Sequence, residues 1–184
     1  MLLTTLLSQH PEAALDIVRG TPAWVGALLA ALIVLGLSAT RARSASPARL
    51  ALLPVAMLGL ALWGVQSAFA TSGRLAELLA LWAVCFAAML ALGLRGAAPA
   101  GTRWNAAARR FHLPGSWAPM ALIGGVFLIK YTVGVQLALE PALAREAGFA
   151  LAVTGLYGLL SGWIAARTLR VLRLQKSATA LVAA

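Results

Sequence analysis

The chain has 184 residues, of which 61% are hydrophobic and only 11% are charged, and its formal net charge is +10. A soluble domain is usually about half apolar and about a quarter charged. A domain of this size cannot bury such an apolar excess in one core, so the composition excludes an ordinary soluble domain and predicts a membrane protein. The basic residues lie between apolar runs, where membrane proteins place them, so we expect no nucleic-acid partner.

The first element in chain order is residues 1–21, which we predict to be an extracytoplasmic segment. It lacks the basic start of a secretory signal, and Pro11, Glu12 and Asp16 interrupt its apolar character. It is too polar to span a bilayer, and an interfacial helix is one interpretation of its apolar residues.

Five apolar runs follow, each close to the roughly 20 helical residues that a hydrocarbon core of about 30 Å requires. They lack the period-2 alternation of membrane strands. The sequence therefore predicts an all-α, polytopic membrane helical bundle within residues 22–174, with a tail at 175–184. The five expected spans are 22–39, 50–70, 75–94, 117–139 and 149–169.

The longest connection is residues 96–116. Its segment Ala106–Phe111 is short, basic and partly apolar, and we expect it to lie along the inner membrane surface. Ser116 follows a Pro-Gly turn and is a predicted N-cap for the fourth span.

The basic residues predict the orientation, because cytoplasmic loops of membrane proteins are enriched in Lys and Arg. Eleven of the fifteen basic residues lie in the connections after the first and third spans and from the end of the fifth span onward: Arg41, Arg43, Arg49, Arg95, Arg103, Arg109, Arg110, Arg167, Arg170, Arg173 and Lys176. This side is predicted to be cytoplasmic, with the N-terminus outside and the C-terminus inside. Whether these charges also bind anionic lipid, or only enforce topology, stays open at this level.

Several short motifs together resemble one family. They are Arg49–Pro54 (RLALLP), Gly64–Phe69 (GVQSAF), Pro114–Trp117 (PGSW), Lys130–Gly134 (KYTVG) and Tyr157–Gly162 (YGLLSG). In this order they are similar to a family of small bacterial multi-pass inner-membrane proteins known only as a domain of unknown function. The resemblance covers roughly Pro22 to Leu174. It implies a bacterial inner-membrane location and supplies no activity, substrate or site.

Lys130 is the most informative single residue, because it lies near the middle of the fourth span. A basic residue there costs about 2.5–3.5 kcal/mol on insertion scales. The functional interpretation is a charge that faces a cavity, an anion or a proton path, and the structural one is a lysine that snorkels or bonds within the bundle. We expect it to face protein, with Tyr157 of the fifth span at a matching depth.

Other polar residues in the spans extend this candidate cluster. Thr154, Tyr157 and Ser161 share one helical face, and Gln66 and Gln136 lie near the outer ends of the second and fourth spans. Each also has a packing explanation, since such side chains bond helices together or satisfy their own backbone. The tripeptide GVQ recurs at both glutamines, which leaves a two-hairpin repeat open.

Small residues predict where helices approach closely. Gly155, Gly158 and Gly162 form a stripe on the fifth span, and Gly134 lies one turn outward of Lys130. We expect internal packing at the stripe, with a dimer interface as the alternative.

Several chemistries are excluded by the sequence. His10 and His112 fall on opposite sides of the predicted membrane, so they cannot share a metal or haem. No Asp or Glu lies in the middle of a span, which argues against a carboxylate proton relay. We expect no metal, no cofactor and no enzymatic activity.

Two functions remain. The first is a non-catalytic interaction or accessory protein whose partners are the lipid bilayer and either a second copy or another membrane protein. The second is a small transporter or channel that uses Lys130 and the polar face of the fifth span.

Overall fold

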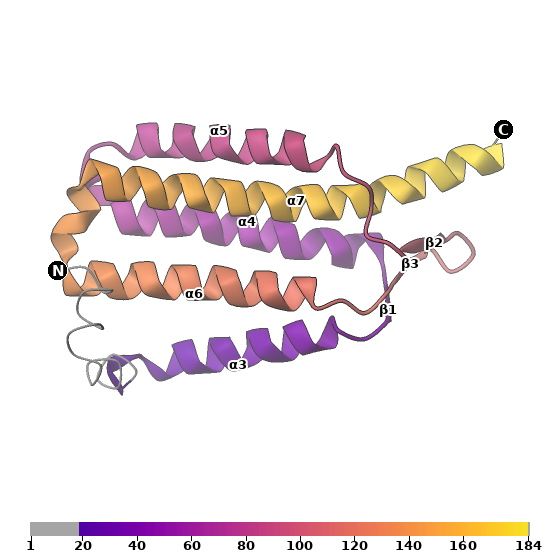
Figure 1. The fold of residues 1–184 in the computed structure, drawn as a ribbon, viewed down its shortest axis with the longest axis horizontal. Helices are drawn as coiled ribbons and strands as arrows, with labels where there is room; N and C mark the ends of the chain where they lie inside the picture. The colour runs from indigo at the N-terminus through magenta and orange to yellow at the C-terminus, as the bar shows by residue number, and fades with distance from the viewer. Residues whose placement is uncertain (1–18, 184) are drawn as a thin grey trace. The chain divides into compact units, whose positions relative to one another are not determined.

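The computed structural model describes residues 19–183, and these are mostly helical (Figure 1). This confirms the all-α prediction in its coarse form. The chain divides into two compact units, and we describe each by itself. Unit 1 comprises the described residues up to 41 together with 115–143, and unit 2 comprises 42–114 and 144–183. The predicted N-terminal segment lies almost entirely outside the described residues.

Unit 1 is an antiparallel pair formed by α3 (Ala23–Ser38) and α6 (Ala118–Leu139). Gly36 packs directly against Met120, so the end of α3 lies beside the start of α6. The Ser116 N–H donates to the Ala39 carbonyl oxygen at 3.0 Å. The Ser116 hydroxyl oxygen accepts from the Ala118 N–H at 3.2 Å. The N-cap of α6 is Trp117, which makes no side-chain cap hydrogen bond, so the prediction of Ser116 as the N-cap is wrong by one residue. The short helix η2 (Pro141–Arg145) then connects α6 to α7.

Unit 2 contains three longer helices, α4 (Pro47–Phe69), α5 (Leu75–Gly93) and α7 (Ala147–Ala183), which lie side by side (Figure 1). Helix α4 starts where the sequence supplies two start signals. Ser46 is its N-cap and accepts from the Arg49 N–H at 3.3 Å, and Pro47 occupies the first helical position, where its missing N–H costs nothing.

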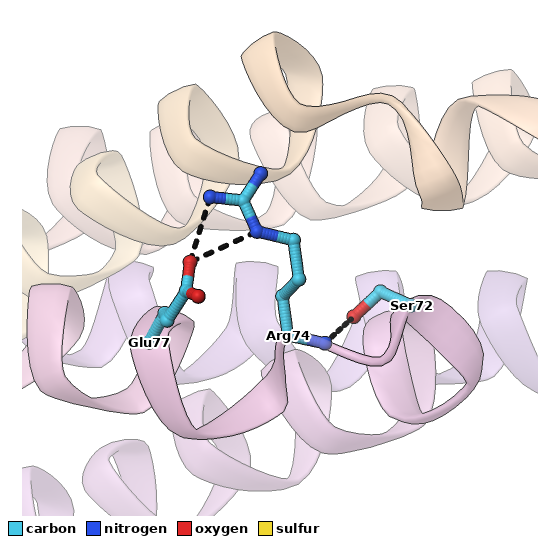
Figure 2. Close-up of polar contacts among 3 residues, drawn as sticks. All are labelled: Ser72, Arg74 and Glu77. Carbon is cyan, nitrogen blue, oxygen red and sulfur yellow. Dashed lines mark hydrogen bonds and ion pairs between the residues drawn. The ribbon is translucent and has the colours of Figure 1, made fainter.

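The connection between α4 and α5 is short, so these helices form a hairpin. It consists of η1 (Ala70–Ser72), then Gly73 with a φ of 71°, which only glycine adopts readily. Figure 2 shows the start of α5, where the Arg74 N–H donates to the Ser72 hydroxyl and the Arg74 guanidinium pairs with Glu77 at 2.6 Å. Glu77 lies in the first turn of α5, where a negative charge is favourable.

The buried core of unit 2 is built around one face of α7. Its buried positions recur at intervals of three and four residues, which is the spacing of one helix face. Helix α4 contributes Val65 and Phe69, both fully buried, and the Phe69 ring meets Phe149 edge-on at 6.5 Å. The buried side chains on α7 are Ala150, Val153, Thr154, Tyr157, Ser161, Ala165, Ala166 and Val171.

A small antiparallel sheet, in the order β1-β3-β2, belongs to unit 2 and was not predicted. Strand β1 (Arg43–Ala45) precedes α4, and the hairpin of β2 (Arg103–Asn105) and β3 (Arg110–Leu113) follows α5. The segment Ala106–Phe111, expected along the membrane surface, thus forms the hairpin turn and the start of β3. Strands β2 and β3 pair within one loop, and β1 from the other loop adds a third strand, because an isolated two-stranded hairpin is only marginally stable.

Within residues 19–183, four helices are long and apolar enough to cross a membrane: α4, α5, α6 and α7. The bounds of α4, α5 and α6 lie close to three of the five predicted spans, and α7 begins close to the start of the predicted fifth span. The predicted first span corresponds to α3, which has 16 residues and is about 24 Å long at 1.5 Å per residue. The count of five spans therefore stays a prediction.

Helix α7 is longer than expected. It continues past the predicted end at residue 169 to Ala183, through the segment that we expected to be a tail. Residues 169–183 contain no glycine or proline and are rich in Leu and Ala, which are strong helix formers. The basic residues of this segment are therefore carried on a regular helix.

Candidate functional site

The predicted intramembrane cluster is distributed over both units. Lys130 and Gln136 lie on α6 in unit 1, whereas Gln66 lies on α4 and Thr154, Tyr157 and Ser161 lie on α7, all in unit 2. Because each unit is described by itself, the approach of Tyr157 to Lys130 stays a prediction.

Lys130 is half-buried and lies twelve residues after the start of α6 and nine before its end. At 1.5 Å per residue these intervals correspond to about 18 Å and 14 Å. The next residue, Tyr131, bonds its phenol oxygen to the Thr21 hydroxyl oxygen at 2.7 Å. Since Thr21 lies two residues before the start of α3, the Tyr131 side chain reaches the level where α3 begins.

The three polar residues on α7 are all buried, and they belong to the face that packs the unit. Thr154 has an exposed fraction of 0%, and Tyr157 and Ser161 have 6% each. The Thr154 hydroxyl has no hydrogen-bond partner among the described residues, nor has the buried indole N–H of Trp82 on α5. The predicted polar face of this helix is thus an interior face of a three-helix unit.

The two glutamines of the repeated tripeptide differ in their surroundings. Gln136 on α6 is 5% exposed, whereas Gln66 on α4 is exposed. The repeat therefore does not give the two hairpins equivalent environments.

The glycine stripe on α7 lies against α5 within unit 2. A Cβ atom added at Gly158 would lie 2.6 Å from the Trp82 carbonyl oxygen, and one at Gly162 would lie 2.5 Å from the Phe86 carbonyl oxygen. At Gly155 the nearest atom is the Cys85 sulfur at an ordinary 3.7 Å. Gly158 and Gly162 therefore let the two backbones approach closely.

Gly134 behaves differently from the stripe. A Cβ atom added there meets no heavy atom within 4 Å in unit 1. The structure of this unit therefore places no helix against Gly134.

The order of these contacts shows that α5 and α7 run parallel. Gly158 contacts Trp82 and Cys85, and Gly162, one turn later, contacts Phe86 and Met89. Further along both helices, Ala166 contacts Gly93. Both helices therefore end on the same side of unit 2.

That shared end is held together by arginines of α7. The Arg173 guanidinium donates to the Leu94 carbonyl oxygen at 3.4 Å, just past the end of α5. Arg170 lies against Gly96, and its guanidinium carbon is 5.8 Å from the centre of the Trp163 ring. Cations at a helix C-terminus are favourable because the last carbonyl groups carry partial negative charge.

This end of unit 2 collects nearly all of the unit's basic residues, and we call it the basic end. The unit's two acidic residues, Glu77 and Glu146, both lie at the opposite end, together with Arg74 and Arg145. The basic end consists of Arg43, Arg49, Arg95, Arg103, Arg109, Arg110, Arg167, Arg170 and Arg173. Its chemistry suits anions.

Sequence reasoning missed the sheet that carries several of these arginines. The signal was present but short: Arg110-Phe111-His112-Leu113 alternates polar and apolar residues, as a half-buried strand does. It was obscured because a strand of four residues next to three alanines also fits a surface helix.

The described residues contain no group of three His, Cys, Asp or Glu side chains that could hold a metal ion. The described chain is thus mostly helical, with four helices suited to crossing a membrane, and its unit 2 has a basic end. The chain belongs to DUF6622, a family of unknown function, whose model matches residues 1–181. This confirms the family resemblance drawn from the motifs. No curated protein and no solved structure matches the chain significantly.

Proposed function

We propose that this protein is a multi-pass protein of the bacterial inner membrane with a non-catalytic interaction or accessory role. The observation that carries its membrane location is the large apolar surface of the helices. Trp63 on α4 is 71% exposed, Val84 on α5 66% and Leu128 on α6 63%. Side chains of this kind on helices of spanning length favour lipid as the surrounding solvent.

The proposed orientation places the basic end in the cytoplasm. It is supported by the parallel course of α5 and α7, because the chain must cross back once between them, and α6 has the length to do so. It is also supported by the nine arginines at one end of unit 2, since Lys and Arg accumulate on the cytoplasmic side.

The fifth span of this proposal is α3. Its length of about 24 Å is shorter than a typical hydrocarbon core of about 30 Å, and a bilayer adapts to such a helix by local thinning. Its antiparallel packing on α6, with the ends at Gly36 and Met120 together, favours a common transmembrane course. An N-terminus outside the cytoplasm then follows.

The accessory role is supported by the burial of the polar residues on α7. Thr154 and Ser161 lie in the packing face of unit 2, where they have no surface to offer a solute. What remains for function is the apolar surface, which suits a second copy or another membrane protein, and the basic end, which suits the anionic surface of the bilayer.

A small transporter or channel is the alternative, and Lys130 is the observation that favours it. A basic side chain near the middle of a span is costly and often marks a substrate path. In this case Lys130 would bind a small anion on its way across the membrane.

Anion flux separates the two functions. Purified protein is reconstituted into liposomes, and chloride flux is measured for the wild type, Lys130→Ala and protein-free liposomes. The accessory role predicts the same slow flux in all three. A flux that requires the wild-type protein and is lost in Lys130→Ala would overturn this role and establish transport.

A further inference from the structure

The small sheet of unit 2 has two different faces. Directly paired residues of an antiparallel sheet project to the same side. Ala45, Phe111 and Trp104 form one such row. Phe111 is fully buried, and its ring centre lies 4.6 Å from that of Trp104. This row is the inner face, and it anchors the sheet.

The opposite face is exposed and basic. Ser44, His112 and Arg103 are paired across the three strands, and Arg110 shares their side because it lies two residues before His112. All four side chains are exposed. No acidic residue occurs in residues 41–74, which contain β1, or in residues 78–139, which contain the hairpin. We call Arg103, Arg110 and His112 the basic sheet face.

The sheet is tied closely to the ends of membrane-crossing helices. Strand β1 ends at Ala45 and α4 begins at Pro47, and β3 ends at Leu113, shortly before α6 begins. Strands of three or four residues are about 10–14 Å long, and the three strands are about 10 Å wide. Headgroup layers are about 5–8 Å thick, and charge acts over a further 8–10 Å. The whole sheet therefore falls within the reach of the headgroups.

The turn of the hairpin adds another positive charge in an uncommon backbone conformation. Arg109 has a φ of 48°, in the left-handed region that glycine or asparagine usually occupies. The turn is held by the Asn105 side-chain oxygen, which accepts from the Ala108 N–H at 2.9 Å. An arginine there adds exposed charge directly beside Arg110.

We infer that the basic sheet face binds the phosphate groups of anionic phospholipids in the leaflet that α4 and α5 enter. This inference rests on the proposed membrane insertion and deepens it by naming the residues and the ligand. Arginine forms paired hydrogen bonds to phosphate oxygens, and each basic residue near an anionic leaflet strengthens binding about five-fold.

A nucleic acid is the other polyanion that such a face could meet. The position of the sheet disfavours it, because an anionic leaflet beside the sheet repels a second negatively charged polymer. A duplex-binding protein that makes about six to ten phosphate contacts uses more basic groups than this small face offers.

Lipid retention by the purified full-length chain tests the inference. The protein in neutral detergent is titrated with phosphatidylglycerol or phosphatidylcholine of identical acyl chains, and bound lipid is counted by native mass spectrometry. The variants are Arg103→Gln/Arg110→Gln and the matched control Arg74→Gln/Arg145→Gln, which removes the same charge at the other end of unit 2.

The wild type and the control should prefer phosphatidylglycerol, and the sheet variant should bind it roughly 25-fold more weakly. Arg103→Lys/Arg110→Lys should restore most of the binding, because the charge is kept. Wild-type affinity in a folded sheet variant would overturn the inference. If the double variant unfolds, the exposed single variant Arg110→Gln decides, with about a five-fold loss expected and no loss contradicting the proposal.

Two further outcomes are distinguishable. A labelled 20-base-pair DNA duplex that binds the wild type in phosphatidylcholine nanodiscs, but not the sheet variant, would assign the face to nucleic acid and overturn the lipid proposal. Release of the chain from membranes by alkaline carbonate would instead contradict the proposed membrane insertion itself.

Discussion

Thr154 is the most deeply buried polar side chain on α7, and its hydroxyl has no hydrogen-bond partner among the described residues. An unpaired buried hydroxyl costs about 1–3 kcal/mol. Thr154→Val keeps the shape and removes this cost, so we expect the free energy of unfolding to rise by about 1 kcal/mol. Titration with sodium dodecyl sulfate measures it, with the exposed Thr132→Val as control. A clear loss of stability would show that the hydroxyl is paired in the bilayer.

Lys130 permits a second test at the residue scale. Lys130→Met removes a charge whose insertion costs about 2.5–3.5 kcal/mol and keeps a side chain of similar length. We expect the variant to fold and to unfold at the same or a higher detergent fraction than the wild type, with Lys130→Arg as the charged control. A large loss of stability in Lys130→Met alone would assign the ammonium group a structural role.

Single residues were predictable from the sequence only in part. Lys130 stands out in the sequence because a charge interrupts an apolar run. The environments of Gln66 and Gln136 could not be predicted, because both occur in the same tripeptide and only packing makes one exposed and the other buried. The burial of Thr154 depends on which face of α7 meets its neighbours, and every face of that helix is apolar enough to do so.

At the scale of elements, the contact between α5 and α7 depends on two glycines. Gly158→Ala and Gly162→Ala each place a methyl group within about 2.6 Å of a backbone oxygen that cannot move alone. Overpacking of this kind typically costs 1–3 kcal/mol. Gly155→Ala is the matched control, since its nearest neighbour would lie at 3.7 Å and alanine favours the helix.

We expect the two contact variants to lower the unfolding transition and the control to leave it unchanged or raise it. The measurement is thermal unfolding in one detergent for all three proteins. Equal behaviour of Gly158→Ala and Gly155→Ala would contradict the close approach of α5 and α7.

In the hairpin turn of β2 and β3, a substitution is expected to raise stability. Arg109→Gly relieves a left-handed backbone conformation that costs a non-glycine residue about 1–2 kcal/mol. We expect slower amide hydrogen exchange in β3 of Arg109→Gly. The control Ala107→Gly relieves no left-handed conformation, so its exchange in β3 should not become slower. Faster exchange in Arg109→Gly would show that the arginine side chain itself stabilises the turn.

Elements were predictable wherever long apolar runs exist. The bounds of α4, α5 and α6 lie close to the apolar runs, because a chain in lipid satisfies its backbone most simply as helix. The sheet was not predicted, since its strands come from two loops far apart in the sequence. The continuation of α7 was missed because the prediction ended the helix where the apolar run ends, whereas charged residues extend helices equally well.

At the scale of the whole molecule, the distribution of charge supports the proposed orientation. Unit 2 carries its acidic residues at one end and nine arginines at the other. The parallel course of α5 and α7 could not be read from either helix alone. It is nevertheless what one crossing by α6 between them predicts, and it places the sheet and the end of α7 on one side of unit 2.

The most direct test of the proposed orientation is a pair of topology reporters in bacterial cells. Alkaline phosphatase, which is active only in the periplasm, and green fluorescent protein are each inserted at residues 71–74 and fused after Lys176. The account predicts phosphatase activity at 71–74 and fluorescence with no phosphatase activity after Lys176. Activity of the same reporter at both positions, or the reverse pattern, would contradict it.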